Sequence, residues 1–176
     1  MLIVALLLPL LAAGAAWQLD RLVPTRHIGY VAIGTLFLSA MTLMTAGLAL
    51  GLPLQMLGIP WIKIDDLQVM LTLRFDPLSW SIACVVLFSS AVGMVGLIHS
   101  LPYNLRNYGR LISLLLLHIV IIVVGIAAQD IMLRVFAWGI AAVVGGLLMR
   151  LSGALPGSNS PLISVVGGIS GAILLM

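Results

Sequence analysis

The sequence has no glutamate, a single cysteine and very few charged residues of any kind. Charged side chains make up 7% of its 176 residues, whereas a soluble domain carries roughly 25%. Hydrophobic residues make up 62%. A soluble chain of this size needs a polar surface against water. The shortage of charge therefore excludes an ordinary soluble domain and indicates that lipid surrounds most of the chain.

The charge and cysteine content also exclude several kinds of site. The net charge is only +3 and no run of basic residues is present, so we expect no nucleic-acid partner. The single Cys84 excludes an internal disulfide and a cysteine-based metal cluster within this chain. The sequence has no Ser/His/Asp set, metal-ligand spacing or phosphate-binding loop. It therefore predicts no catalytic residue, no cofactor and no metal.

Charged and proline-rich interruptions divide the chain into apolar segments, most of them near the roughly 20 residues that cross a hydrocarbon core. We interpret residues 1–176 as a single transmembrane domain, an all-α bundle of about six transmembrane helices. The first helix runs to about Trp17 and is interpreted as retained rather than as a signal peptide, because no basic residue precedes it. The other expected helices cover about 28–51, 77–99, 110–128, 131–151 and 161–176.

The insert between the second and third helices has a different pattern. Apolar and polar residues roughly alternate on both sides of Asp65-Asp66, a turn-forming pair. This pattern predicts a short β-hairpin over about 61–75 at the membrane surface. The loops on the hairpin's side carry three basic residues and those on the other side carry five. The positive-inside rule then predicts that the N-terminus and the hairpin lie outside.

Three ionisable residues are candidates for proton transfer, because charge near lipid is costly and often functional. His118 is the most interior of them. It could relay protons, or it could be a neutral histidine bonded to a neighbouring helix, and we favour the second interpretation. His99 and Asp76 lie at opposite ends of the third expected helix. Asp76 followed by Pro77 is typical of a helix start, so capping is the better interpretation there.

Small and aromatic residues predict how the helices pack. Gly139, Gly145 and Gly146 belong to a small-residue face of the fifth helix that favours close helix contact, and Gly168 adds to the set in the last segment. Arg134 is expected to reach the interface or to pair with Asp130. The tryptophans near the predicted interfaces suggest an aromatic belt; they are Trp17, Trp61 and Trp80.

The last segment, Pro161–Met176, rises only about 24 Å as a helix, which is short of a roughly 30 Å hydrocarbon core. We expect partner helices to shelter its end, or the chain to continue beyond Met176.

Helices three to five together resemble the antiporter-like, proton-conducting membrane subunits of respiratory NADH dehydrogenase (complex I) and the related Mrp-type antiporters. The resemblance covers about Trp61 to Leu151, and it depends on the order and spacing of short motifs. These motifs are Phe75-Asp76-Pro77-Leu78-Ser79, Gly96-Leu97-Ile98-His99, Tyr108-Gly109-Arg110, and Asp130 through Phe136-Ala137-Trp138. The family also begins with an outside N-terminus, two helices and an outside hairpin. The resemblance implies an energy-transducing membrane, such as the bacterial inner membrane, and a place in an NADH:quinone oxidoreductase-type complex.

Two departures from the family pattern concern the proton path. The family places an essential glutamate directly after the helix-five tryptophan, paired with a later lysine, but here Trp138 is followed by Gly139. The family fold also needs about fourteen helices, and this sequence corresponds only to the N-terminal portion. We therefore expect a chain that is not catalytic alone.

The resulting hypothesis is a non-catalytic or degenerate antiporter-like subunit that supports the membrane arm of a larger energy-converting complex. Its expected partners are lipid and other membrane subunits of a hetero-oligomer. Two alternatives remain open at this point. The chain could be the N-terminal half of a split proton or sodium channel. It could also be an accessory subunit of an unrelated respiratory or photosynthetic complex.

Overall fold

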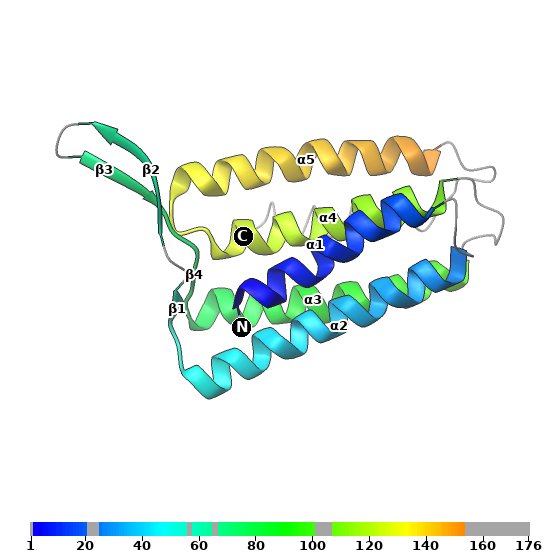
Figure 1. Ribbon diagram of the computed structural model, residues 1–176, viewed down its shortest axis with the longest axis horizontal. Helices are drawn as coiled ribbons and strands as arrows, with labels where there is room; N and C mark the ends of the chain where they lie inside the picture. The colour runs from blue at the N-terminus through cyan, green and yellow to red at the C-terminus, as the bar shows by residue number, and fades with distance from the viewer. Residues whose placement is uncertain (1, 21–24, 56–57, 65–66, 101–106, 154–176) are drawn as a thin grey trace.

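The computed structural model describes residues 2–20, 25–55, 58–64, 67–100 and 107–153. These residues form five helices, which lie side by side lengthwise, and four short strands at one end of the bundle (Figure 1). The helices are α1 (Leu2–Leu19), α2 (Thr25–Leu50), α3 (Pro77–Ser100), α4 (Tyr108–Ala127) and α5 (Ile131–Gly153). The strands are β1 (Leu54–Gln55), β2 (Ile59–Ile64), β3 (Leu67–Leu71) and β4 (Arg74–Phe75).

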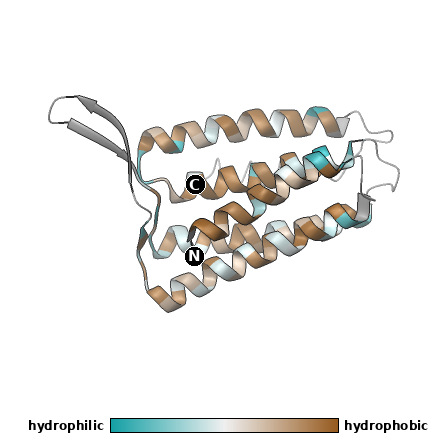
Figure 2. Cartoon of the chain, in the orientation of Figure 1, coloured by the Kyte–Doolittle hydropathy of each residue, from teal (hydrophilic) through white to brown (hydrophobic). Residues whose placement is uncertain are grey.

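Helices α2 to α5 are long and apolar enough to cross a membrane, and the apolar stretch of α1, Ile3–Leu19, is shorter. Figure 2 shows hydrophobic colour along most of each helix, with the most hydrophilic positions near helix ends. The predicted helical membrane class is therefore confirmed. The predicted count of six is not reached, because the described residues hold five helices. The sixth expected segment, 161–176, lies outside them.

Helix α4 lies at the centre of the described bundle. It packs against α1, α2, α3 and α5, whereas the main neighbour of α5 is α4 alone. The apolar span of α4 is 67% buried inside the bundle, whereas that of α5 is only 22% buried. A helix that is apolar nearly all round suits such a central position, since most of its faces meet another helix. One side of α5 is left without a neighbouring helix among the described residues.

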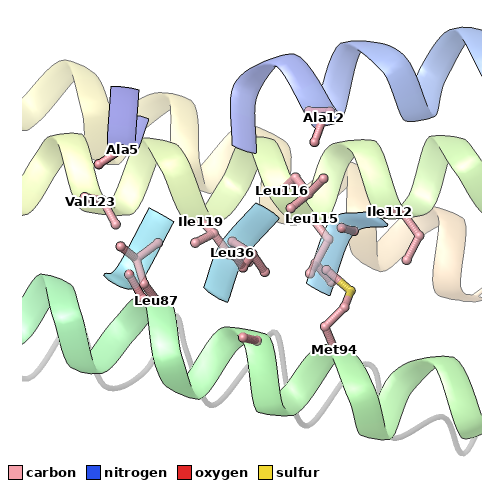
Figure 3. Packing of buried hydrophobic residues seen from close by; sticks show 14 of the residues in the cluster. Ala5, Ala12, Leu36, Leu87, Met94, Ile112, Leu115, Leu116, Ile119 and Val123 are labelled. Carbon is pink, nitrogen blue, oxygen red and sulfur yellow. The ribbon is translucent and has the colours of Figure 1, made fainter. Parts of the chain in front are cut away.

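The core forms where α1, α2 and α3 meet α4. Figure 3 shows Leu36 of α2 and Leu87 of α3 near Ile119 of α4, with the small Ala5 and Ala12 on α1. All five side chains are more than nine-tenths buried. Small residues let helix backbones approach closely, and close packing is a main source of helix association where lipid replaces water. The alanine-rich face of α1 therefore allows this shorter helix to lie against its neighbours.

Helices α2 and α3 are joined by a tryptophan. The indole Nε1 of Trp80 donates a hydrogen bond to the Leu43 carbonyl at 2.9 Å. The ring lies directly over Gly47, where an added Cβ would overlap the indole. Trp80 is thus a packing residue between two helices, and it lies in the first turn of α3; its expected place in an aromatic belt stays a prediction.

The strands correct the predicted position of the hairpin. Strand β2 pairs with β3 in an antiparallel ladder from Ile59↔Leu71 to Ile64↔Leu67, so the hairpin begins and ends earlier than the expected 61–75. Asp65 and Asp66, the expected turn, lie outside the described residues. The ladder is irregular next to Pro60, which has no N–H to donate.

The chain beyond Leu71 does not belong to the hairpin because its backbone groups bond elsewhere. Leu73 forms an isolated bridge with Ala128, and the Gln129 N–H donates to the Thr72 carbonyl at 3.2 Å. Strand β4 then pairs with β1, which follows α2. These contacts fasten the base of the hairpin to the α4–α5 connection.

We predict that Gly47→Ala destabilises the bundle, because the new methyl group meets the Trp80 ring. Overpacking of this kind costs about 1–3 kcal/mol. Gly34→Ala on the same helix is the matched control, since a Cβ there meets nothing within 4 Å. It should be neutral or slightly stabilising, because alanine favours the helix. Unfolding of both variants in mixed micelles measures the difference, and equal stabilities would contradict the Trp80 packing.

Candidate functional site

His118 is the eleventh of the twenty residues of α4 and therefore lies at its middle. Its side chain is 4% exposed and faces α5. A Cβ on Gly145 of α5 would lie 3.5 Å from the imidazole Cε1. The position of this histidine thus depends on a glycine in the adjoining helix, which leaves room for the ring.

The polar atoms of the His118 ring are buried without a formed hydrogen bond. Neither Nδ1 nor Nε2 has a partner in hydrogen-bond geometry among the described residues. The Ala141 carbonyl of α5 is the acceptor near the ring. The ring therefore faces α5, and the favoured interpretation, a neutral histidine bonded to a neighbouring helix, stays a prediction. A buried imidazole in such surroundings is held most cheaply in its neutral form, since burial opposes charge.

His99 occupies a different environment, at the C-terminal end of α3. Its side chain is exposed, and Nδ1 lies 2.9 Å from the Val95 carbonyl one turn earlier. This contact with the carbonyl four residues earlier holds the ring against its own helix. The arrangement is that of an exposed residue at a helix end.

Asp76 caps the N-terminus of α3. Its Oδ1 accepts hydrogen bonds from the Ser79 N–H at 2.8 Å and the Ser79 hydroxyl at 2.6 Å. The Asp76 N–H donates in return to the Ser79 hydroxyl at 2.9 Å, and Pro77 is the first residue of the helix. The predicted capping role is confirmed. The Ser79 hydroxyl and N–H together lower the pKa of the Asp76 carboxyl below its ordinary value of 3.8, because they bond to its charged form.

The three candidate relay residues do not come together. Asp76 and His99 are separated by the length of α3, about 34 Å at 1.5 Å per residue. His118 lies on α4 at mid-height. Within the described residues no group of three His, Cys, Asp or Glu side chains is arranged to hold a metal ion. This part of the chain therefore has no continuous set of titratable side chains from one end of the bundle to the other.

The glycines expected on one face of α5 are divided between two faces. Gly145 is buried against α4, beside His118. Gly139 and Gly146 are exposed, and a Cβ on either would meet nothing within 4 Å. Gly145 therefore packs against α4, while packing of Gly139 and Gly146 against another helix stays a prediction, since residues 145 and 146 differ by about 100° around a helix. Gly168 lies outside the described residues.

The carboxylate that caps α4 comes from a distant part of the chain and was not predicted from the sequence. Asp20, just after α1, accepts a hydrogen bond from the Gly109 N–H at 2.5 Å. A Cβ on Gly109 would strike the Ala16 carbonyl and the Asp20 side chain, so only glycine allows this approach. The two partners are 89 residues apart, and no local pattern relates them. An anion at a helix N-terminus is favoured by the unpaired N–H groups there.

Two arginines at opposite ends of the bundle also depend on tertiary contacts. The Arg134 guanidinium donates to the Ala128 carbonyl at 2.8 Å rather than to Asp130, so of the two expected alternatives the pairing with Asp130 is not the one observed, and reach to the interface stays a prediction. This bond satisfies a carbonyl just after α4 that the helix leaves open. At the other end the Arg110 guanidinium lies 5.5 Å from the centre of the Trp17 ring, a cation–π contact between α4 and α1.

We predict that acid weakens the start of α3. Because the folded-state pKa of Asp76 is lowered, its contribution to stability is present above pH 3.8 and is lost as the pH falls through that lowered pKa. Asp76→Asn should remove this part of the acid dependence of thermal unfolding in detergent. An unchanged profile in Asp76→Asn would contradict the role of the ionised cap.

The chain was compared with protein-family models and with curated protein sequences. No protein-family model matches the chain, and no curated protein sequence matches it significantly. Its function is therefore inferred from the residues and contacts described above.

Proposed function

We propose that this chain is a non-catalytic, antiporter-like membrane subunit that supports a larger energy-converting complex of the NADH:quinone oxidoreductase type. The order of its elements supports the proposal. Two helices, α1 and α2, precede paired strands, and three helices follow. The resemblance described for Phe75 to Trp138 implies the same order. Asp76 and Ser79, which belong to the first of those motifs, form the cap that starts α3.

The surroundings of Gly139 carry the proposal. The resemblance implies an essential carboxylate at this position, directly after Trp138. Gly139 has no side chain and is exposed on α5, whereas His118 lies at the buried α4–α5 contact beside Gly145. Gly139, the position of the family's acid, therefore faces away from α4. His118 instead lies on the side of α5 that packs against α4. Such an arrangement supports a structural role rather than proton conduction.

The positions of the carboxylates agree with a structural role. All five acidic residues of the chain are aspartates, and none lies inside a described helix. Asp20 and Asp76 cap helices. A proton path through the bilayer requires a series of titratable groups or waters across the apolar core. Among the described residues, His118 has no carboxylate at its own depth with which to exchange a proton.

The proposed setting is an energy-transducing membrane, with the N-terminus and the hairpin outside and the arginine-rich loops that follow α1 and α3 inside. This orientation is based on the positive-inside rule, since the loops placed inside carry more basic residues than those placed outside. In a Cys84→Ser background, Asn107→Cys should react with a membrane-impermeant maleimide only after the inner side is opened. Asp66→Cys should react from outside. Labelling of both from one side would overturn this orientation.

The composition of the native complex tests the proposal. After extraction in mild detergent, the chain should co-purify with other antiporter-like subunits, and mass spectrometry identifies them. A complex without any such subunit would contradict the proposal and favour an accessory role in an unrelated assembly. A partner chain that begins with helix six or seven of the family fold and carries a mid-helix lysine would instead favour a split channel.

Proton pumping by the same complex provides the functional test. His118→Gln should leave the pumping rate within about twofold of wild type, because a lone buried histidine is not expected to carry protons. His99→Gln, at an exposed helix end, is the matched control. If His118→Gln abolishes pumping in a fully assembled complex while His99→Gln does not, His118 is a relay and the split channel is the better function.

A further inference from the structure

The end of the bundle opposite the strands is cationic (Figure 1). Arg110 lies in the first turn of α4 and Arg150 in the last turn of α5, and both turns are at this end. Among the described residues the one carboxylate here is Asp20, which already caps α4. Asp76 and Asp130 lie at the other end of the bundle, where α3 and α5 begin. Two guanidinium groups and one carboxylate leave this end with a net positive charge.

Arg110 is held against an indole ring at this end. Its Cζ lies 5.5 Å from the centre of the Trp17 ring, and the Trp17 side chain is half exposed. Arg110 is itself partly exposed, and none of the carboxylates in the described part of the chain forms an ion pair with it. A guanidinium stacked on a ring keeps its N–H edge available for a second partner, and the oxygens of a phosphate fit that edge. The Arg110–Trp17 pair therefore has the donors for a phosphate group.

An apolar line on α1 leads away from this pair. Leu7, Leu10, Gly14 and Trp17 recur every three or four residues, and all four are exposed. A Cβ on Gly14 would meet nothing within 4 Å, so the surface is open there. From Leu7 to Trp17 the helix rises about 15 Å, which is half of a roughly 30 Å hydrocarbon core. The line thus has the length of one lipid leaflet, with the Arg110–Trp17 pair at its polar end.

We propose that the Arg110–Trp17 pair binds the phosphate of an anionic phospholipid, whose acyl chain lies along this apolar line of α1. Basic side chains at helix ends attract anionic head groups, and a tryptophan ring is favoured at the depth of those head groups. A free phosphate ion matches the guanidinium but leaves the apolar line unused. A zwitterionic phospholipid brings an ammonium group to an end that is already positive. This inference goes beyond the proposed function, since it holds for any host complex.

Arg150 provides a control of the same charge at a similar depth. Helices α4 and α5 run antiparallel, with His118 beside Gly145. Arg110 is eight residues from His118, and Arg150 is five residues from Gly145 toward the same end. The two arginines therefore differ in depth by three residues, or about 5 Å. Arg150 is exposed on α5, whose main neighbour is α4, whereas the Trp17 ring belongs to α1.

Native mass spectrometry of the full chain in detergent, titrated with phosphatidylglycerol, measures the binding. Arg110→Gln should weaken the affinity for phosphatidylglycerol about fivefold, the effect of one basic residue near an anionic head group. Arg150→Gln should stay close to the wild-type affinity. Arg110→Lys keeps the charge but loses the planar stack on the ring, so its affinity should lie between those of the wild type and Arg110→Gln. Phosphatidylcholine should bind more weakly than phosphatidylglycerol and should not distinguish these variants.

Three results would overturn the proposal. Equal losses in Arg110→Gln and Arg150→Gln would indicate a diffuse cationic surface instead of a site. Equal affinities for phosphatidylglycerol and phosphatidylcholine would remove the role of the anionic head group. Displacement of phosphatidylglycerol by an equimolar amount of inorganic phosphate would show a phosphate-ion site without a lipid. If Arg110→Gln does not fold, Arg110→Lys decides, and an affinity equal to that of the wild type then contradicts the stacked arrangement.

Discussion

The described bundle depends on the close packing of α4 among its neighbours. Its buried residues face α1, α2, α3 and α5, and most of them are large and aliphatic. In a membrane, helices gain little from leaving water and must associate through close contact and hydrogen bonds. The alanines of α1 and Gly145 of α5 provide that close contact. Larger side chains on these faces would disturb the packing of the whole bundle, because α4 is the helix that contacts all the others.

Hydrogen bonds at the two ends of the bundle complement this packing. Backbone groups at helix ends need partners wherever water is scarce. Asp20 meets this need for α4, Asp76 for α3, and the Arg134 guanidinium for the Ala128 carbonyl. Three of the chain's few charged groups are therefore occupied in fixing helix ends. This use of charge leaves few ionisable residues for transport.

The environment of His118 shows how packing limits chemistry in this fold. The imidazole lies at mid-span against a glycine, and its nitrogens form no hydrogen bond with the described residues. A charged imidazole there would need a counter-ion or water to offset its burial. The carboxylates Asp20, Asp76 and Asp130 are at the helix ends. The same separation that makes two of them good caps therefore removes all three from this interior titratable group.

The sequence alone determined the features that depend on composition and on neighbouring residues. Its apolar runs predicted four spans to within about three residues, because the bilayer sets their length. The Asp76-Pro77 pair predicted the start of α3, since capping involves residues only three apart.

Only the tertiary structure decided which residues meet across helices. It placed Trp80 on Gly47, joined Asp20 to Gly109, and divided the α5 glycines between a buried and an exposed face. It also moved the hairpin toward the N-terminus, because the residues after Leu71 pair with β1 and the α4–α5 connection. Helix rotation and strand register are set by contacts between residues tens of positions apart, and in a chain apolar on nearly every face no local pattern specifies them.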